Sequence, residues 1–194
     1  MNFLLHIKHW QLFLLLFAFP FILEIILIII MVATQNFTIM IFVFPVLAII
    51  LLVIFFGWFY MLGTKLAEKL PETVTVNLTK FKIFLFSPIA YIILLSIFMV
   101  SMFANLAITK EQPNPLIFLA ILPLHLFFMF CIFYCMYFIA KCLRAVELQR
   151  PVTFSEFAGE FVLIWFFMIG VWIIQPRINK IFSEEKEAME QLFT

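Results

Sequence analysis

Apolar residues are gathered into four long stretches and a fifth short one, and most polar residues fall in the connections. The long stretches cover about residues 11–33, 39–62, 83–107 and 116–140, and the short one covers 161–174. A helix needs about 20 apolar residues to cross the hydrocarbon core of a bilayer, so each long stretch can cross. The alternating strands of a transmembrane β-barrel are missing. The pattern predicts an all-α integral membrane protein, a four-helix transmembrane bundle in one domain over residues 1–194.

Composition agrees with a helix bundle surrounded by lipid. Hydrophobic residues make up 66% of the chain, whereas a soluble domain is about half apolar. The net charge of +1 gives no reason to expect nucleic-acid binding. The bilayer is therefore the expected surrounding of most of the chain.

Basic residues indicate which side of the membrane each connection faces. Lys8 precedes the first stretch, four lysines lie between the second and third, and further lysines and arginines follow the fourth, whereas Lys110 lies between the third and fourth. The positive-inside rule then predicts a multi-pass protein of the inner (cytoplasmic) membrane with both termini in the cytoplasm. Several aromatic residues near the predicted inner ends are expected to be interfacial anchors: Trp10, Trp58, Tyr60, Tyr134 and Tyr137.

The fifth stretch is too short to be read as an ordinary span. Apolar runs of its length are more often re-entrant, interfacial or buried than spanning. If it crossed, the basic residues that follow it would lie outside. Thr153 and Glu156 fit a capping box that starts a helix, and Pro176 fits a helix stop. Because of its short apolar run and the basic residues after it, we expect a short re-entrant or interfacial helix. A helix between these two signals is nevertheless long enough to cross obliquely, so a fifth crossing is the alternative.

The tail, residues 177–194, has the pattern of an amphipathic helix. Its apolar residues lie near one helical face and its glutamates lie largely elsewhere. Because acidic side chains oppose anionic lipid, we expect this helix to pack on the bundle or on a protein partner. The connection at 141–151 is predicted to be helical up to Pro151, with Arg144 and Glu147 paired one turn apart.

Among the polar residues within the apolar stretches, Glu24 and His125 are the candidate site residues. Glu24 lies within the first stretch, where a charge costs about 2.5–3.5 kcal/mol on insertion scales. His125 lies at a similar predicted depth in the fourth stretch, and the two helices can be neighbours in a bundle. We therefore expect an intramembrane Glu24–His125 pair. It would serve as a proton relay or ion pathway, or as a structural contact worth about 0.6 kcal/mol.

Other residues give weaker indications of chemistry. Each long stretch carries a proline, which is either a hinge or a tolerated kink. Cys131, Cys135 and Cys142 are read as small packing residues, with a soft-metal site or acylation of Cys142 as alternatives. No nucleophile–base, metalloprotease or phosphate-binding motif is present. We therefore expect no catalytic residue, no cofactor and no metal site.

Three stretches carry a resemblance to known proteins: residues 7–17 (IKHWQLFLLLF), 146–154 (VELQRPVTF) and 172–180 (WIIQPRINK). They resemble small uncharacterised multispanning membrane proteins of Bacteroidota, and this resemblance implies no function. The size and four-span layout are also similar to those of transmembrane accessory proteins of type VI-B CRISPR loci. That resemblance implies modulation of an RNA-guided ribonuclease in antiviral defence, and it assigns no role to individual residues.

These features favour a non-enzymatic accessory or regulatory protein that acts through its cytoplasmic loops and tail. Its expected partners are the lipid bilayer and either another protein or further copies of itself. The alternative is an oligomeric pore or small proton- or ion-coupled transporter that uses Glu24 and His125.

Overall fold

The regular structure is helical throughout the part of the chain that the structure describes. The computed structural model describes residues 3–36, 38–110 and 114–192, with no side chain described at 38–42, 44–45, 107, 115, 118, 120 and 184–192. The elements in order are α1 (Phe3–His6), α2 (His9–Phe13), the π-helical turn η1 (Leu14–Ala18), α3 (Phe19–Thr34), α4 (Thr38–Glu68), α5 (Leu78–Thr109), α6 (Pro115–Leu148), α7 (Phe154–Trp165) and α8 (Phe167–Leu192). The all-α prediction is confirmed.

In the part of the chain that the structure describes, four helical segments are long and apolar enough to cross a membrane: His9–Thr34, Val46–Glu68, Leu78–Leu106 and Ile121–Leu148. Each overlaps one of the four predicted stretches, with its ends shifted by up to eight residues. Helices α4 and α6 continue past the apolar residues, to Glu68 and Leu148 respectively. Pro88 and Pro123 lie inside continuous helices. A multi-pass membrane protein therefore follows from both the sequence and the helices.

Polar residues at the helix ends explain where the helices start. The side chains of Asn77 and Asn114 accept hydrogen bonds from backbone N–H groups in the first turns of α5 and α6, which have no partner within the helix. At the start of α7, Thr153 and Glu156 form the predicted capping box. Left-handed residues end α3, α5 and α6: Gln35, Lys110 and Gln149.

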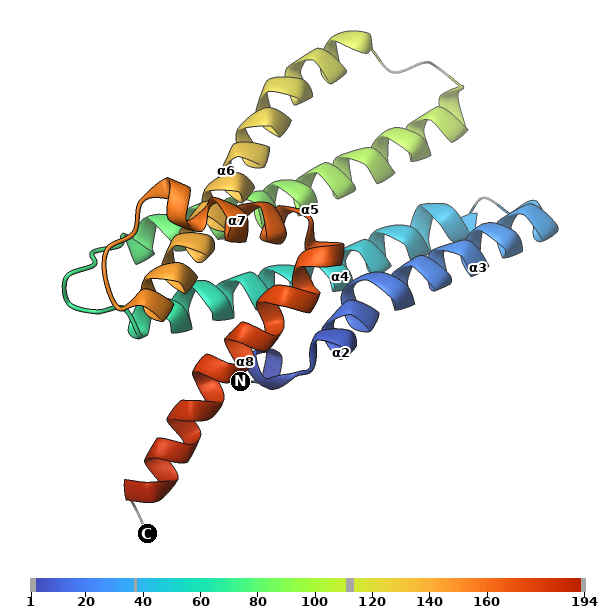
Figure 1. Cartoon of the computed structure of the whole chain (residues 1–194). Helices are drawn as coiled ribbons and strands as arrows, with labels where there is room; N and C mark the ends of the chain where they lie inside the picture. Colours follow the sequence, from blue (N-terminus) through green and yellow to red (C-terminus); the bar gives the residue numbers. More distant parts are fainter. Residues whose placement is uncertain (1–2, 37, 111–113, 193–194) are drawn as a thin grey trace.

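The long helices form two hairpins that pack together at one end only (Figure 1). Helix α3 packs on α4, and α6 packs on α4, α5 and α7. Every buried side chain that the structure describes lies within residues 5–12, 56–91 and 131–182. We call this region, residues 3–13, 56–91 and 131–182, the packed end. Residues 14–55 and 92–130 form the open end, where the hairpins diverge.

The four long helices of the predicted bundle pack together at the packed end and diverge at the open end. The open end is rich in exposed apolar side chains, such as Ile29, Val53, Leu94 and Leu119. Lipid tails are as apolar as these side chains, so no hydrophobic force drives the helices together within a bilayer. Closure therefore occurs only where the packed end supplies a continuous core.

The fifth apolar stretch is divided between two helices. Helix α7 ends at Phe166, whose N–H donates to the Val162 carbonyl, and the Phe166 carbonyl then accepts from Gly170 at the start of α8. A Cβ on Gly170 would fall onto the Leu163 carbonyl, so only glycine permits this close packing of α8 on α7. The structure thus breaks the helix ten residues before Pro176.

The predicted stop at Pro176 is wrong, because α8 runs through it to Leu192. A proline inside a helix removes one hydrogen bond, yet contacts on both sides hold this helix. Gln175 and Ile178 are both completely buried. Tertiary packing therefore overrides the local effect of the proline. Continuous α8 also makes the tail helical as far as Leu192, and Ile178 and Phe182 bury part of its apolar face.

Candidate functional site

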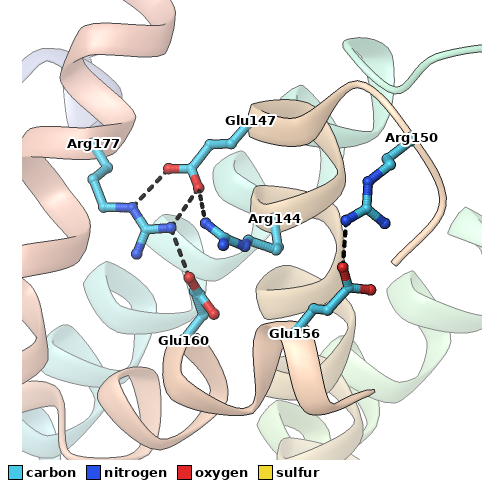
Figure 2. Close-up of polar contacts among 6 residues, drawn as sticks. All are labelled: Arg144, Glu147, Arg150, Glu156, Glu160 and Arg177. Atoms are coloured by element: carbon cyan, nitrogen blue, oxygen red, sulfur yellow. Dashed lines mark hydrogen bonds and ion pairs between the residues drawn. The ribbon is translucent and has the colours of Figure 1, made fainter. Parts of the chain in front are cut away.

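Arg177 of α8 joins three helices at the packed end (Figure 2). Its Nε donates to Glu147 Oε1 on α6 at 2.7 Å, and its Nη2 donates to Glu160 Oε1 on α7, also at 2.7 Å. Nη2 also donates to the second carboxylate oxygen of Glu147. Arg144 lies one turn before Glu147 and pairs with it at 3.4 Å, which confirms the pairing predicted within α6. We call Arg144, Glu147, Glu160 and Arg177 the charged cluster.

The charged cluster is shielded from solvent to different degrees. The Glu160 side chain is only 10% exposed, against 27% for Arg177. Two parallel bonds from one guanidinium to one carboxylate are stronger and more directional than single neutral hydrogen bonds. The hydrogen bonds to Glu147 raise the pKa of Arg177 above its ordinary value. Arg177 is therefore a fixed positive charge that holds two carboxylates from different helices.

A second ion pair lies at the exposed start of α7. Arg150 pairs with Glu156, the same residue that completes the capping box with Thr153. The hydrogen bond from Arg150, with those from Thr153, lowers the pKa of Glu156 to about 2. This pair fixes the connection between α6 and α7 but is accessible to solvent.

Gln175 is the centre of a buried polar network. Its side chain is completely buried. Its Nε2 donates to the backbone carbonyls of Leu4 and Ile7 and to the Asn179 side chain, and its Oε1 accepts from Trp58 Nε1 at 3.0 Å. These carbonyls can accept from side chains because the helix is interrupted between α1 and α2. Gln175 therefore ties the N-terminal segment to α4 and α8.

Trp58 corrects one prediction from the sequence. It was expected at the membrane interface, but it is 1% exposed and packs against Phe59 and Phe167. Its indole N–H finds its acceptor in Gln175 rather than in the headgroup region. Tryptophan combines an apolar ring with one N–H donor, so its position at the end of an apolar stretch fits a buried site with an acceptor as well as a membrane interface.

A shallow cavity of about 660 Å³ opens beside the charged cluster. Its lining combines basic, acidic and apolar side chains: Lys69, Val146, Glu147, Gln149, Arg177, Lys180 and Ile181. The Lys69 ammonium also lies 5.0 Å from the Phe182 ring. This surface can recognise a partner through mixed charge and apolar contact. Within the described residues, no group of three or more His, Cys, Asp or Glu side chains gathers as a metal site would.

The predicted Glu24–His125 pair is not formed within the described chain. Glu24 lies on α3 and lines a cavity of about 310 Å³ between α3 and α4. His125 lies on α6, exposed, with its ring 6.1 Å from that of Tyr91 on α5. The two residues thus lie on different hairpins, without a hydrogen bond or ion pair between them in the described structure. Their role in proton transfer stays a prediction.

The cysteines lie in the core of α6. Cys131, Cys135 and Cys142 are free and buried, as expected of small packing residues. Cys142 is completely buried, which keeps its thiol away from the surface that acylation would require.

The sequence did not single out Glu160, Gln175 or Arg177. Glu160 and Gln175 immediately flank the fifth apolar stretch, and a polar residue beside a buried apolar run was the available signal. Comparison of the chain with protein-family models, with curated proteins and with solved structures gave no match.

Proposed function

We propose that the chain is a non-enzymatic accessory protein of the inner membrane, whose packed end faces the cytoplasm and binds a protein partner. The observation that carries the proposal is the charged cluster. A single arginine binds carboxylates on α6 and α7, so the end of a candidate span, the α7–α8 hairpin and the tail form one rigid unit. A rigid surface with fixed charges and a shallow cavity suits recognition of another protein.

The distribution of basic residues supports the cytoplasmic orientation. Arginine and lysine side chains surround the packed end, including Lys65, Lys80, Lys141 and Arg150, whereas Lys110 lies at the open end. Cytoplasmic connections carry the excess of Lys and Arg in inner-membrane proteins. Both termini then lie in the cytoplasm.

The packing of α7 and α8 supports a re-entrant hairpin. Aromatic side chains of α7 pack along α6. The ring centroids of Phe157 and Tyr137 are 5.2 Å apart, and those of Trp165 and Phe133 are also 5.2 Å apart. Phe133 lies about seven residues inside the predicted inner end of its span, which is a depth of about 10 Å in a hydrocarbon core of about 30 Å. The exposed apolar tip, Trp165 to Ile169, therefore enters the inner leaflet and returns.

The resemblance to accessory proteins of type VI-B CRISPR loci suggests one partner, an RNA-guided ribonuclease. The alternative function, an oligomeric pore or small transporter, is favoured by the carboxyl group of Glu24 in its membrane-level cavity. The two functions make different demands. An accessory protein needs an accessible packed end, whereas a pore needs a polar route through the open end.

Site-specific photocross-linking distinguishes them. A benzophenone amino acid is placed at exposed packed-end positions, Glu72 or Gln149, at Ser183 next to the packed end, and at matched exposed open-end positions, Gln35 or Val53. We expect one protein adduct of constant size from the packed end, and its loss in Arg177→Ala. Adducts from the open end alone would contradict the proposal.

Two functional measurements complete the test. Co-expression with a type VI-B ribonuclease should change the depletion of its target RNA, and Arg177→Ala should abolish that change. Proton or ion flux in proteoliposomes well above that of empty vesicles, lost in Glu24→Gln, would instead favour the pore.

A further inference from the structure

Glu24 occupies an apolar cavity without a polar partner in the described structure. The cavity is lined by side chains of η1, α3 and α4, among them Leu23, Leu27, Leu51 and Ile54. Its volume of about 310 Å³ is near the lower limit of ordinary ligand sites, about 300–1,000 Å³. It can therefore take a ring and its aliphatic neighbours. A carboxyl group at membrane depth is costly unless it is paired, which makes the cavity incomplete as it stands.

His125 is the complementary group. It is exposed on α6, and among the described residues of the open end it and Lys110 are the basic side chains. Glu24 lies about ten residues before the end of α3 at Thr34, and His125 lies about ten residues after the start of α6 at Pro115. At about 1.5 Å per residue, both are about 15 Å below the open-end tips of their helices. They lie at matching distances from the open-end tips of their helices.

The two groups do not meet within one chain. Helices α3 and α4 form one hairpin and α5 and α6 form the other, and the hairpins diverge at the open end (Figure 1). The Glu24 cavity is built by the first hairpin alone, while His125 is on the surface of the second. Each copy thus presents an acidic cavity on one hairpin and a basic side chain on the other, at the same level.

We propose that the Glu24 cavity of one copy receives His125 of a second copy. The contact is heterologous, because it joins two different surfaces, and such contacts generate rings when the rotation closes. Apolar side chains one turn nearer the open end complete it: Ile28 beside Glu24 and Leu122 beside His125, which are 47% and 55% exposed. The inference does not depend on the partner proposed for the packed end.

Disulfide cross-linking in membranes tests the contact. The three native cysteines are replaced by alanine, and this background must remain monodisperse and helical. One tagged chain carries Ile28→Cys and a differently tagged chain carries Leu122→Cys. The matched control replaces Ile28→Cys with Ile26→Cys, which is equally exposed but lies on another face of α3. We expect a heterodimer with both tags, at least fivefold above the control.

Polar variants test the role of the pair itself. Glu24→Gln or His125→Leu should lower the cross-linked yield about three- to tenfold, in the range of membrane hydrogen bonds. The double exchange Glu24→His with His125→Glu should restore it.

Three outcomes overturn the proposal. A single chain carrying both cysteines that forms only an internal disulfide means that the hairpins close on each other. Equal yields from Ile28→Cys and Ile26→Cys mean random collision. A protein that stays monomeric in nanodiscs by native mass spectrometry, with or without a bound lipid, means that no second copy fills the cavity.

Discussion

The packed end and the open end both contain long apolar helix segments, but the packed end carries most of the charged residues and the two regions are stabilised differently. At the packed end, completely buried side chains such as Leu62, Leu66, Ile139 and Leu143 form a core. The buried side chains of Glu160 and Gln175 are hydrogen-bonded within it. At the open end, each hairpin exposes its apolar side chains. Lipid can replace a protein core around apolar helices, but it cannot supply hydrogen-bond partners for the side chains of Glu160 and Gln175. Structural specificity is therefore concentrated where polar groups must be paired.

The largest expected effect is that of Arg177→Ala. It leaves the nearly buried Glu160 and the partly buried Glu147 without their shared partner. Breaking a buried pair by removing one side costs about 3–5 kcal/mol, and partial exposure lowers this to about 2–4 kcal/mol. SDS titration of the free energy of unfolding measures it. Arg150→Ala, which breaks an exposed pair, is the control and should cost less than about 1 kcal/mol.

Gly170→Ala should have the next largest effect. The added Cβ meets the Leu163 backbone, which cannot move as a side chain would, so overpacking costs about 1–3 kcal/mol. The matched control is Gly159→Ala on α7, where no atom lies within 4 Å of the added Cβ. The control should be neutral, or stabilising by up to about 1 kcal/mol through helix propensity. Equal effects of the two substitutions would contradict the close approach of α8 to α7.

Gln175→Leu should separate the N-terminal segment from the core. It keeps the volume but removes the acceptor of the Trp58 indole N–H and the donor to the Leu4 carbonyl, while the Ile7 carbonyl keeps its hydrogen bond from Asn179. The loss should cost about 1–3 kcal/mol. Hydrogen exchange should become faster across α1 and α2, while α5 is unchanged. Unchanged protection of α1 and α2 would mean that apolar packing alone holds the N-terminus.

The smallest effect concerns acid. The pKa of Glu156 is lowered from 4.5 to about 2, so this group stabilises the folded state above its unfolded pKa. That contribution is lost as the pH falls from about 4.5 towards 2. Protection of the first turn of α7 against hydrogen exchange should fall over this window, after correction for intrinsic rates. In Glu156→Gln the fall should be absent; a fall of the same size would assign it to another group.

The candidate spans and several local features could be predicted from the sequence. Helix length follows from the apolar stretches, and the capping box at Thr153 and Glu156 depends only on neighbouring residues. The Arg144–Glu147 pair is also local to one helix. Such features need no knowledge of the rest of the fold.

Long-range features could not be predicted in the same way. Trp58 and Gln175 are 117 positions apart, and nothing near either residue specifies the other. The break at Phe166 depends on how closely α8 can approach α7 through Gly170, while Pro176, the more obvious breaker, is held in a helix by its packing. Glu24 attracted attention because it interrupts an apolar stretch. Glu160 and Gln175 only flank an apolar stretch, yet these are the side chains for which the structure provides hydrogen-bond partners.

In the proposed topology, the packed end is a single unit on one side of the membrane, because the chain turns back at Phe166. Labelling of single cysteines by a membrane-impermeant maleimide tests it, in a cysteine-free background and in inverted inner-membrane vesicles. Ser155→Cys and Ser183→Cys, before and after the turn, should both react without permeabilisation, whereas Gln35→Cys should require it. Reaction of Ser155→Cys alone, with Ser183→Cys protected until the vesicles are opened, would make the fifth stretch a crossing and contradict the account.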